Sequence, residues 1–242
     1  MMRRIISLIL VGICLMASAQ DERESKAFKD RFFLGMVSAY YIDFVSSPLQ
    51  KLDRSVDLGG GVITPDTAVP FQTTYLSYVS IGLEPRYNLY EFNEDLAIAV
   101  SMPMTVGFGQ AFPQNEDVEG ASGFGNVQVP LMLKGYYGTQ STYDSRANFG
   151  LSAGIGLEYN KLGLVDLDGR NWIKDANKGW FMPCASIAFH MWRNNAPIEV
   201  NLKIGRGPMT DYDQDKFGQF LTDGKRKTRA SSAKLSFVYL FN

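Results

Sequence analysis

Apolar and polar residues alternate with a period of two along most of this 242-residue chain. In residues 147–159 the pattern is clearest: from Phe149 to Tyr159 the odd-numbered positions are apolar and the even-numbered positions are small or polar. Successive side chains of a β-strand point to opposite faces, so such a segment has one apolar face and one polar face. The chain is therefore predicted to fold from amphipathic strands.

The same alternation occurs in seven further windows, which are 32–44, 75–90, 96–108, 125–137, 180–192, 197–205 and 233–241. Pro103, Pro130 and Pro183 fall inside them, and we expect bulges or kinks there because proline cannot donate to a strand ladder. Eight strands are favoured. Ten remain open, because 56–64 or part of 206–232 has room for another hairpin.

Ionised residues within these windows fall on the small or polar face and never on the apolar face. They are Asp43, Glu84, Arg86, Lys134, Glu158, Glu199, Lys203 and Lys234. A sheet with one apolar face buries it either inside a soluble protein or outward against lipid. The ionised residues would accordingly lie in solvent in the first case and along a central lumen in the second.

Several features favour lipid. Most windows exceed the roughly 9–11 residues that a tilted membrane strand needs, and the connections alternate between long (45–74, 109–124, 160–179, 206–232) and shorter. A lipid-facing Arg or Lys at mid-bilayer costs roughly 2–4 kcal/mol, which favours placing Arg86 and the lysines inside. Aromatic residues gather near the window ends, as interfacial girdles require: Phe32, Phe44, Tyr75, Tyr90, Phe108, Phe124, Tyr136, Tyr159, Phe181, Trp192 and Phe241.

The amino terminus is predicted to be a secretory signal peptide, residues 1–19, cleaved after Ala19. Arg3 and Arg4 precede an apolar run that is too short for a membrane anchor, and Ala17-Ser18-Ala19 fits the small-residue cleavage pattern. A charged segment, 20–30, would then lead into a barrel domain, 31–242. The mature chain keeps 22 basic and 25 acidic residues, a net charge of −3, which argues against nucleic-acid binding.

The dyad strands, including FGLSAGIGLEY, together with the signal peptide and the closing AKLSFVYLF, resemble the small outer-membrane β-barrel proteins of Gram-negative bacteria. The resemblance covers nearly all of 31–242 and implies an all-β, closed, antiparallel up-and-down transmembrane barrel in the outer membrane. It also implies contact with outer-membrane lipid and lipopolysaccharide. In such barrels the last strand, here with Phe237, Tyr239 and Phe241, is recognised by the barrel-assembly machinery; Asn242 follows Phe241 and departs from the pattern.

Candidate chemistry is sparse. His190 is the single histidine, and the sequence places no serine or acid beside it, so we expect a lumen residue rather than a catalytic base. Asp211, Asp213 and Asp215 form a weak loop cation candidate, and a solvated loop is favoured. With one His and two Cys, no metal site or cofactor is expected. The small row Gly150, Ser152, Gly154 and Gly156 leaves room on one wall for a bulky residue such as Met132 or for a water path.

The sequence thus predicts a non-enzymatic, monomeric outer-membrane barrel, either porin-like or structural and adhesive, with long extracellular loops and both termini in the periplasm. The lumen-lining ionised residues either form a pore or pair into a plug, and a plug is favoured because eight strands leave an interior just wide enough for side chains. The alternatives are a soluble periplasmic lipocalin-like carrier and an outer-membrane lipid-modifying enzyme.

Overall fold

A computed structural model describes residues 28–54, 67–113, 121–163, 179–193, 196–212 and 226–241. A short 3-10 helix, Phe28–Arg31, precedes the strands. No helix among the described residues is both long and apolar enough to cross a bilayer. The strands are β1 (Phe32–Ser46), β2 (Gln50–Arg54), β3 (Thr67–Phe71), β4 (Thr73–Asn93), β5 (Leu96–Ser101), β6 (Met104–Pro113), β7 (Ala121–Gly138), β8 (Phe149–Leu162), β9 (Trp180–Arg193), β10 (Ala196–Tyr212) and β11 (Arg226–Phe241).

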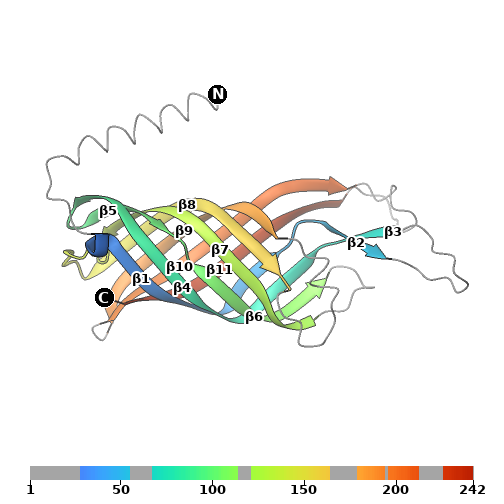
Figure 1. Cartoon of the computed structure of the whole chain (residues 1–242), viewed down its shortest axis with the longest axis horizontal. Coiled ribbons are helices and arrows are strands. Elements are labelled where there is room, and N and C mark those ends of the chain that lie inside the picture. The colour runs from blue at the N-terminus through green and yellow to red at the C-terminus, as the bar shows by residue number, and fades with distance from the viewer. Residues whose placement is uncertain are drawn as a thin grey trace, which may run out of the picture.

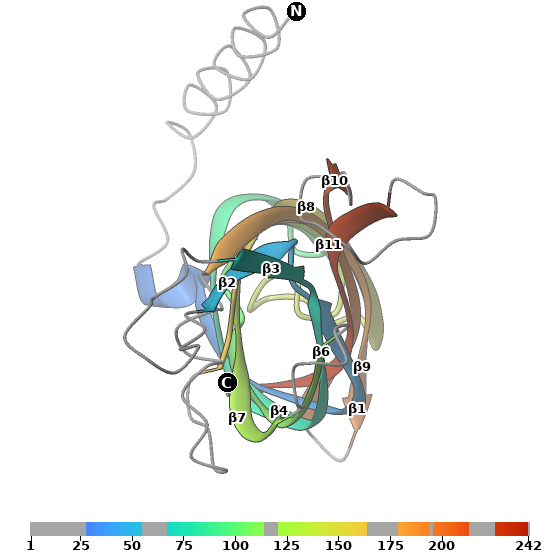
Figure 2. The ribbon, with the colours of Figure 1, turned by 90° about the vertical axis from the view of Figure 1, so that its right-hand side faces the viewer.

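Nine of these strands form one closed antiparallel sheet. Consecutive strands of this sheet pair with each other, except β5 with β6, and β1 pairs with both β4 and β11, which closes the ring (Figure 2). The strands β5 and β6 both lie between β4 and β7, so they occupy one position and the barrel has eight. The predicted eight-stranded up-and-down barrel is confirmed. Closure leaves no unpaired edge, the condition that a bilayer imposes on a sheet.

The strand ends that flank the long connections lie at one end of the barrel, and those that flank the shorter connections lie at the other (Figure 1). At one end, which we call the turn end, Glu94–Asp95 joins β4 to β5 and residues 139–148 join β7 to β8. The start of β1 and the end of β11 lie at this end too, because Leu34 pairs with Phe241. The opposite end, which we call the loop end, carries the small hairpin β2–β3 between β1 and β4.

Two of the predicted long loops are shorter than expected. β6 and β7 remain paired as far as Ala111 and Ala121, which leaves only 114–120 between the strands instead of 109–124. β10 and β11 remain paired as far as Tyr212 and Arg226, so strand also covers much of 206–232. No additional barrel strand occurs among the described residues. The alternation of apolar and polar residues is weak where the strands extend into 109–124 and 206–232. The strand ends predicted from this alternation were therefore placed too early.

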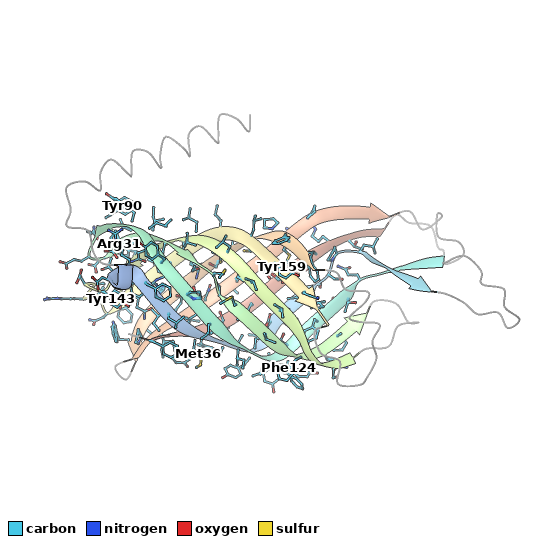
Figure 3. The ribbon with its side chains drawn as sticks, in the orientation of Figure 1. Arg31, Met36, Tyr90, Phe124, Tyr143 and Tyr159 are labelled. Carbon is cyan, nitrogen blue, oxygen red and sulfur yellow. The ribbon has the colours of Figure 1, made fainter. Side chains whose placement is uncertain are left out.

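The alternation of faces is as predicted. Apolar side chains of the windows point outward, with Ile155 70% and Leu157 59% exposed, while the intervening residues are buried inside. Figure 3 shows Met36, Tyr90 and Phe124 on the outer surface. Two aromatic residues depart from the predicted girdles: Tyr75 and Tyr136 point inward and are buried. Each has a place inside, since Tyr75 donates its hydroxyl to the Gly123 carbonyl and the Tyr136 ring lies against His190.

Proline marks a strand interruption at only one of the three predicted positions. Pro103 lies with Met102 in the break between β5 and β6. Pro130 and Pro183 stand in regular register with Glu158 and Leu157, so the kinks expected there are wrong. Pro130 lies in the part of β7 between its pairings with β5 and with β6, where no partner requires its missing N–H.

Candidate functional site

The lumen of the barrel collects all eight ionised residues singled out from the sequence. None of Asp43, Glu84, Arg86, Lys134, Glu158, Glu199, Lys203 and Lys234 is more than 4% exposed. Alternation along each strand brings them inside, since every one has an outward apolar neighbour in its strand. Four are acidic and four are basic, so their formal charges cancel.

Five of the buried polar residues form a continuous chain, which we call the Asp43 network. Lys234 Nζ lies 3.1 Å from Asp43 Oδ2, and Gln128 donates to the other carboxylate oxygen at 2.6 Å. The Gln128 carbonyl accepts from Lys203 Nζ at 2.6 Å, and this ammonium also lies 2.7 Å from Glu158 Oε2. The chain joins β11, β1, β7, β10 and β8 across the lumen. Gln128, which carries no charge, is the link that charge patterning did not identify.

Hydroxyl groups complete the Asp43 network. Ser80 donates to Asp43, Ser232 donates to Glu158 at 3.2 Å, and Lys234 donates to Thr105 at 2.7 Å. Charge-assisted hydrogen bonds of this kind are stronger than neutral ones, and they offset part of the cost of removing the charges from water.

A second group, which we call the Lys134 network, lies around Lys134. Lys134 Nζ lies 2.9 Å from Glu84 Oε1 and 3.4 Å from Glu199 Oε1. Two carboxylates that share one ammonium leave one negative charge, and Arg86, two residues from Glu84 on β4, adds a positive charge to the same part of the lumen without an ion pair to either carboxylate among the described residues. The network joins β4, β7 and β10, so the two networks together connect strands all around the barrel.

His190 lies beside the Lys134 network and is fully buried. Its Nε2 is 2.9 Å from Ser152 Oγ, while its Nδ1 is 3.3 Å from Gln140 Oε1 and 3.7 Å from Glu199 Oε2. The structure thus supplies the serine and the acid that the sequence did not place near His190. A nucleophile also needs access to its substrate, yet Ser152 is only 3% exposed.

The turn between β7 and β8 folds into the lumen at the turn end. Residues Thr139 to Thr142 are buried although they belong to a connection. Arg86 Nη2 donates to the Gln140 carbonyl at 2.5 Å, and Asn88 donates to the Ser141 carbonyl at 2.8 Å. The Arg86 guanidinium also stacks between two rings, 3.8 Å from the centroid of Phe33 and 4.2 Å from that of Tyr136. This turn and the side chains that hold it close one end of the barrel.

Apolar side chains also occupy the lumen, on either side of the ion pairs. Phe33, Val37, Val238 and Leu240 form one buried cluster toward the turn end. Toward the loop end the buried cluster is larger, and it consists of Val45, Tyr75, Ala111, Leu162, Trp180, Met182 and Ala230. The sequence pattern indicated neither cluster, because an inward apolar residue breaks the alternation of polarity although the side chains still alternate in direction.

The row of small residues on β8 is covered by side chains from β7. A Cβ on Gly154 would lie 2.5 Å from Lys134 Cγ, and one on Gly156 would lie 2.1 Å from the Leu131 carbonyl oxygen. Met132 pairs with Gly156 and is buried beside it. Bulky residues fill the space as expected, although they come from the adjacent strand.

The predicted loop cation candidate is not tested, because it falls outside the residues that the structure describes. Asp211 is the residue before the last in β10, but its side chain lies outside the described residues. Asp213 and Asp215 also lie outside them, as do the predicted signal peptide and most of segment 20–30. Among the described residues no cluster of His, Cys, Asp or Glu could hold a metal ion. Cys184 is a buried free thiol. Phe237, Tyr239 and Phe241 share the outward face of β11.

Comparison with known proteins found no matching family model and no matching curated protein. Among solved structures the chain is similar to the outer membrane protein OprG from Pseudomonas aeruginosa, with 16% identity and a TM-score of 0.40 over 87% of this chain and 94% of that one. It is also similar to Ail, the attachment invasion locus protein of Yersinia pestis (10%, 0.34, 87% and 99%), and to the outer membrane protease OmpT from Escherichia coli (8%, 0.36, 90% and 97%). At such low sequence identities and TM-scores, these structures support no conclusion about the activity of this chain. The assignment of the fold as a barrel is based on the strand pairing described above.

Proposed function

We propose that this chain is a non-enzymatic outer-membrane β-barrel protein of a Gram-negative bacterium. Its closed, ion-paired barrel holds long loops at the cell surface. One observation carries the proposal: ionised side chains occupy the inside of the barrel while large apolar side chains cover the outside. Water would favour the reverse arrangement, and a bilayer favours this one.

The apolar outer face of the barrel argues against a soluble lipocalin-like carrier. Such a carrier buries its apolar face inside the barrel, whereas here Ile155, Ile187 and Phe181 are 59–70% exposed. A contiguous apolar surface around a whole barrel is far larger than the patches that soluble monomers tolerate. With the turn end toward the periplasm, both chain ends lie there and the long connections reach the cell surface, as in other membrane barrels.

A structural or adhesive role is favoured over a porin. The Asp43 and Lys134 networks cross the lumen, an apolar cluster lies on either side of them, and the turn at Thr139–Thr142 closes the turn end. A solute would have to break several buried ion pairs to pass. In a closed barrel of this kind, the surface loops are the part of the chain that would contact other molecules.

An enzymatic role has one supporting observation, the contact of Ser152 with His190 and the nearby Glu199. We infer that these residues are structural, because all three are buried and Glu199 is also engaged by Lys134. Replacing His190 with alanine should leave the composition of the cell's lipid A unchanged, as read by mass spectrometry. An altered lipid A in cells with the wild-type chain, lost in H190A, would instead favour the lipid-modifying enzyme.

Conductance in a planar bilayer tests the non-conducting barrel. The folded chain, identified by its heat-modifiable shift on a gel, should insert and leave the bilayer sealed. The triple variant E84A/K134A/E199A removes the Lys134 network and should also leave the bilayer sealed if it still gives the gel shift, because the Asp43 network, both apolar clusters and the turn at Thr139–Thr142 remain in the lumen. Regular channel openings from the wild-type chain would favour a porin, and a chain soluble without detergent would contradict the membrane barrel.

A further inference from the structure

A shallow groove lies on the outer wall of the barrel, over β1, β11 and β10, and has a volume of about 350 Å³. The strand register aligns Phe44, Ala233 and Ile204 in one row across the three strands. The next outward row toward the loop end contains Ser46, Ser231 and Arg206. The small residues of β11 form the floor, and the larger Phe44 and Ile204 stand on either side of it. One end of the groove is therefore apolar and the other is cationic.

Arg206 marks the end of the apolar surface on β10. The outward residues from Ile198 to Ile204 are all apolar, and Arg206 is the next outward position and is exposed. No ion pair joins it to any residue that the structure describes. Ser231 lies beside it in the register, and Ser46, on the far side of the row, shares a hydrogen bond with Thr74 at 2.9 Å.

The other charged side chains that the structure describes on the outer wall at this end have the same sign. Arg229 lies two residues from Ser231 along β11, and Lys161 lies on the outward face of β8. Among the side chains that the structure describes, no acidic residue points outward at the loop end. Glu91, Glu94, Asp95 and Asp144 all lie toward the turn end. The described part of the outer wall at the loop end is thus complementary to a leaflet that carries negative charge at that level.

We propose that this groove binds a phosphorylated glycolipid of the outer leaflet. The inference rests on the proposed function, which places the loop end at the cell surface. The phosphate would contact the Arg206 guanidinium, whose planar set of donors suits phosphate, with the Ser231 hydroxyl as a second donor. An acyl chain would follow the apolar row formed by Phe44, Ala233 and Ile204. A glycolipid fits better than a simple phospholipid because hydroxyl groups line the cationic end, where sugar hydroxyls would lie.

Lipid retention by the full chain tests the site. The folded protein is reconstituted in phosphatidylcholine vesicles that contain lipopolysaccharide, phosphatidylglycerol at equal phosphate, or neither, and the lipid that remains bound after detergent extraction is measured by native mass spectrometry. We expect lipopolysaccharide to be retained and phosphatidylglycerol not. The R206Q variant should retain about tenfold less, because a charge-assisted contact is lost.

Two further variants separate a site from diffuse attraction. K161Q removes a cation at the same end but outside the groove, and it should retain lipopolysaccharide as the wild type does. A233F leaves the charges in place and fills the floor, and it should reduce retention as R206Q does. Equal retention by R206Q and the wild type, an equal loss in K161Q, or equal retention of phosphatidylglycerol would overturn the glycolipid site.

The gel shift of the same samples separates this inference from the proposed function. A wild-type chain that gives no heat-modifiable form in any vesicle overturns both. One that inserts normally and retains no lipopolysaccharide overturns the groove alone.

Discussion

Lys203 Nζ lies 2.7 Å from Glu158 Oε2 inside the barrel, and neither side chain is more than 5% exposed. The two residues are on β10 and β8, so the pair reaches across β9. On β9, Lys203 pairs with Ser186 and Glu158 pairs with Met182, so the two side chains meet over the inner face of that strand. A contact between strands that are not neighbours holds the curvature of the wall as well as its pairing.

Replacing Glu158 with glutamine should destabilise the folded barrel by about 3–5 kcal/mol, because Lys203 would be left as a buried charge without its carboxylate. Urea titration in lipid vesicles, followed by the gel shift, measures the free energy of unfolding. The double variant E158L/K203M removes both charges and should recover most of the loss. A single variant as stable as the wild type would mean that the pair is hydrated rather than buried.

Replacing Ile155 with arginine tests whether the outer face meets lipid. Ile155 is 70% exposed, so in water an arginine there would be nearly neutral. At mid-bilayer it should cost roughly 2–4 kcal/mol. Phe149, at the turn end of the same strand and 65% exposed, is the matched control, because an arginine near the interface costs only about 0–1 kcal/mol. Unfolding free energies in vesicles that are equal for I155R and F149R would contradict the orientation.

Much of this architecture follows from the alternation of apolar and polar residues along the strands. Alternation alone identified the eight positions of the barrel and the inward direction of residues as distant in sequence as Asp43 and Lys234. It did not identify their partners, because register between strands depends on closure, bulges and turns. The bulge between Ala39 and Asp43, where Tyr41 has a φ of 57°, is one example that no local signal predicted.

The inward apolar residues and the buried turn between β7 and β8 could not be predicted from the sequence, for a different reason. Trp180, Leu162 and Phe33 are apolar residues on the face where the pattern predicts polar ones, so they weaken the alternation. The buried residues from Thr139 to Thr142 look like any polar connection in sequence. The contacts that hold this connection inside come from distant β4, where Arg86 donates to the Gln140 carbonyl and Asn88 donates to the Ser141 carbonyl.

Replacing Arg86 with glutamine should loosen the turn between β7 and β8. The variant loses the 2.5 Å bond to the Gln140 carbonyl and the stacking on Phe33 and Tyr136. Hydrogen exchange by mass spectrometry should then be faster in residues 139–142, whose backbone hydrogen bonds depend on the fold of this turn. Exchange in the centre of β8 should stay slow. Protection of 139–142 equal to that of the wild type would mean that Asn88 and the apolar cluster hold the turn without Arg86.

Glycine-to-alanine variants at Gly156 and Gly135 should have opposite effects. A Cβ on Gly156 would meet the Leu131 carbonyl oxygen at 2.1 Å, so the backbones of β7 and β8 would have to separate. We expect G156A to cost about 1–3 kcal/mol.

Gly135 is the matched control, because its Cβ would have no atom within 4 Å. There alanine removes conformational freedom from the unfolded chain and should stabilise the barrel by about 0.4–1 kcal/mol. Both free energies can be measured by urea titration in the same vesicles. If G156A proved as stable as G135A, β8 would not pack against β7 as closely as this register requires, and the packing of Met132 and Lys134 over the glycine row would be wrong.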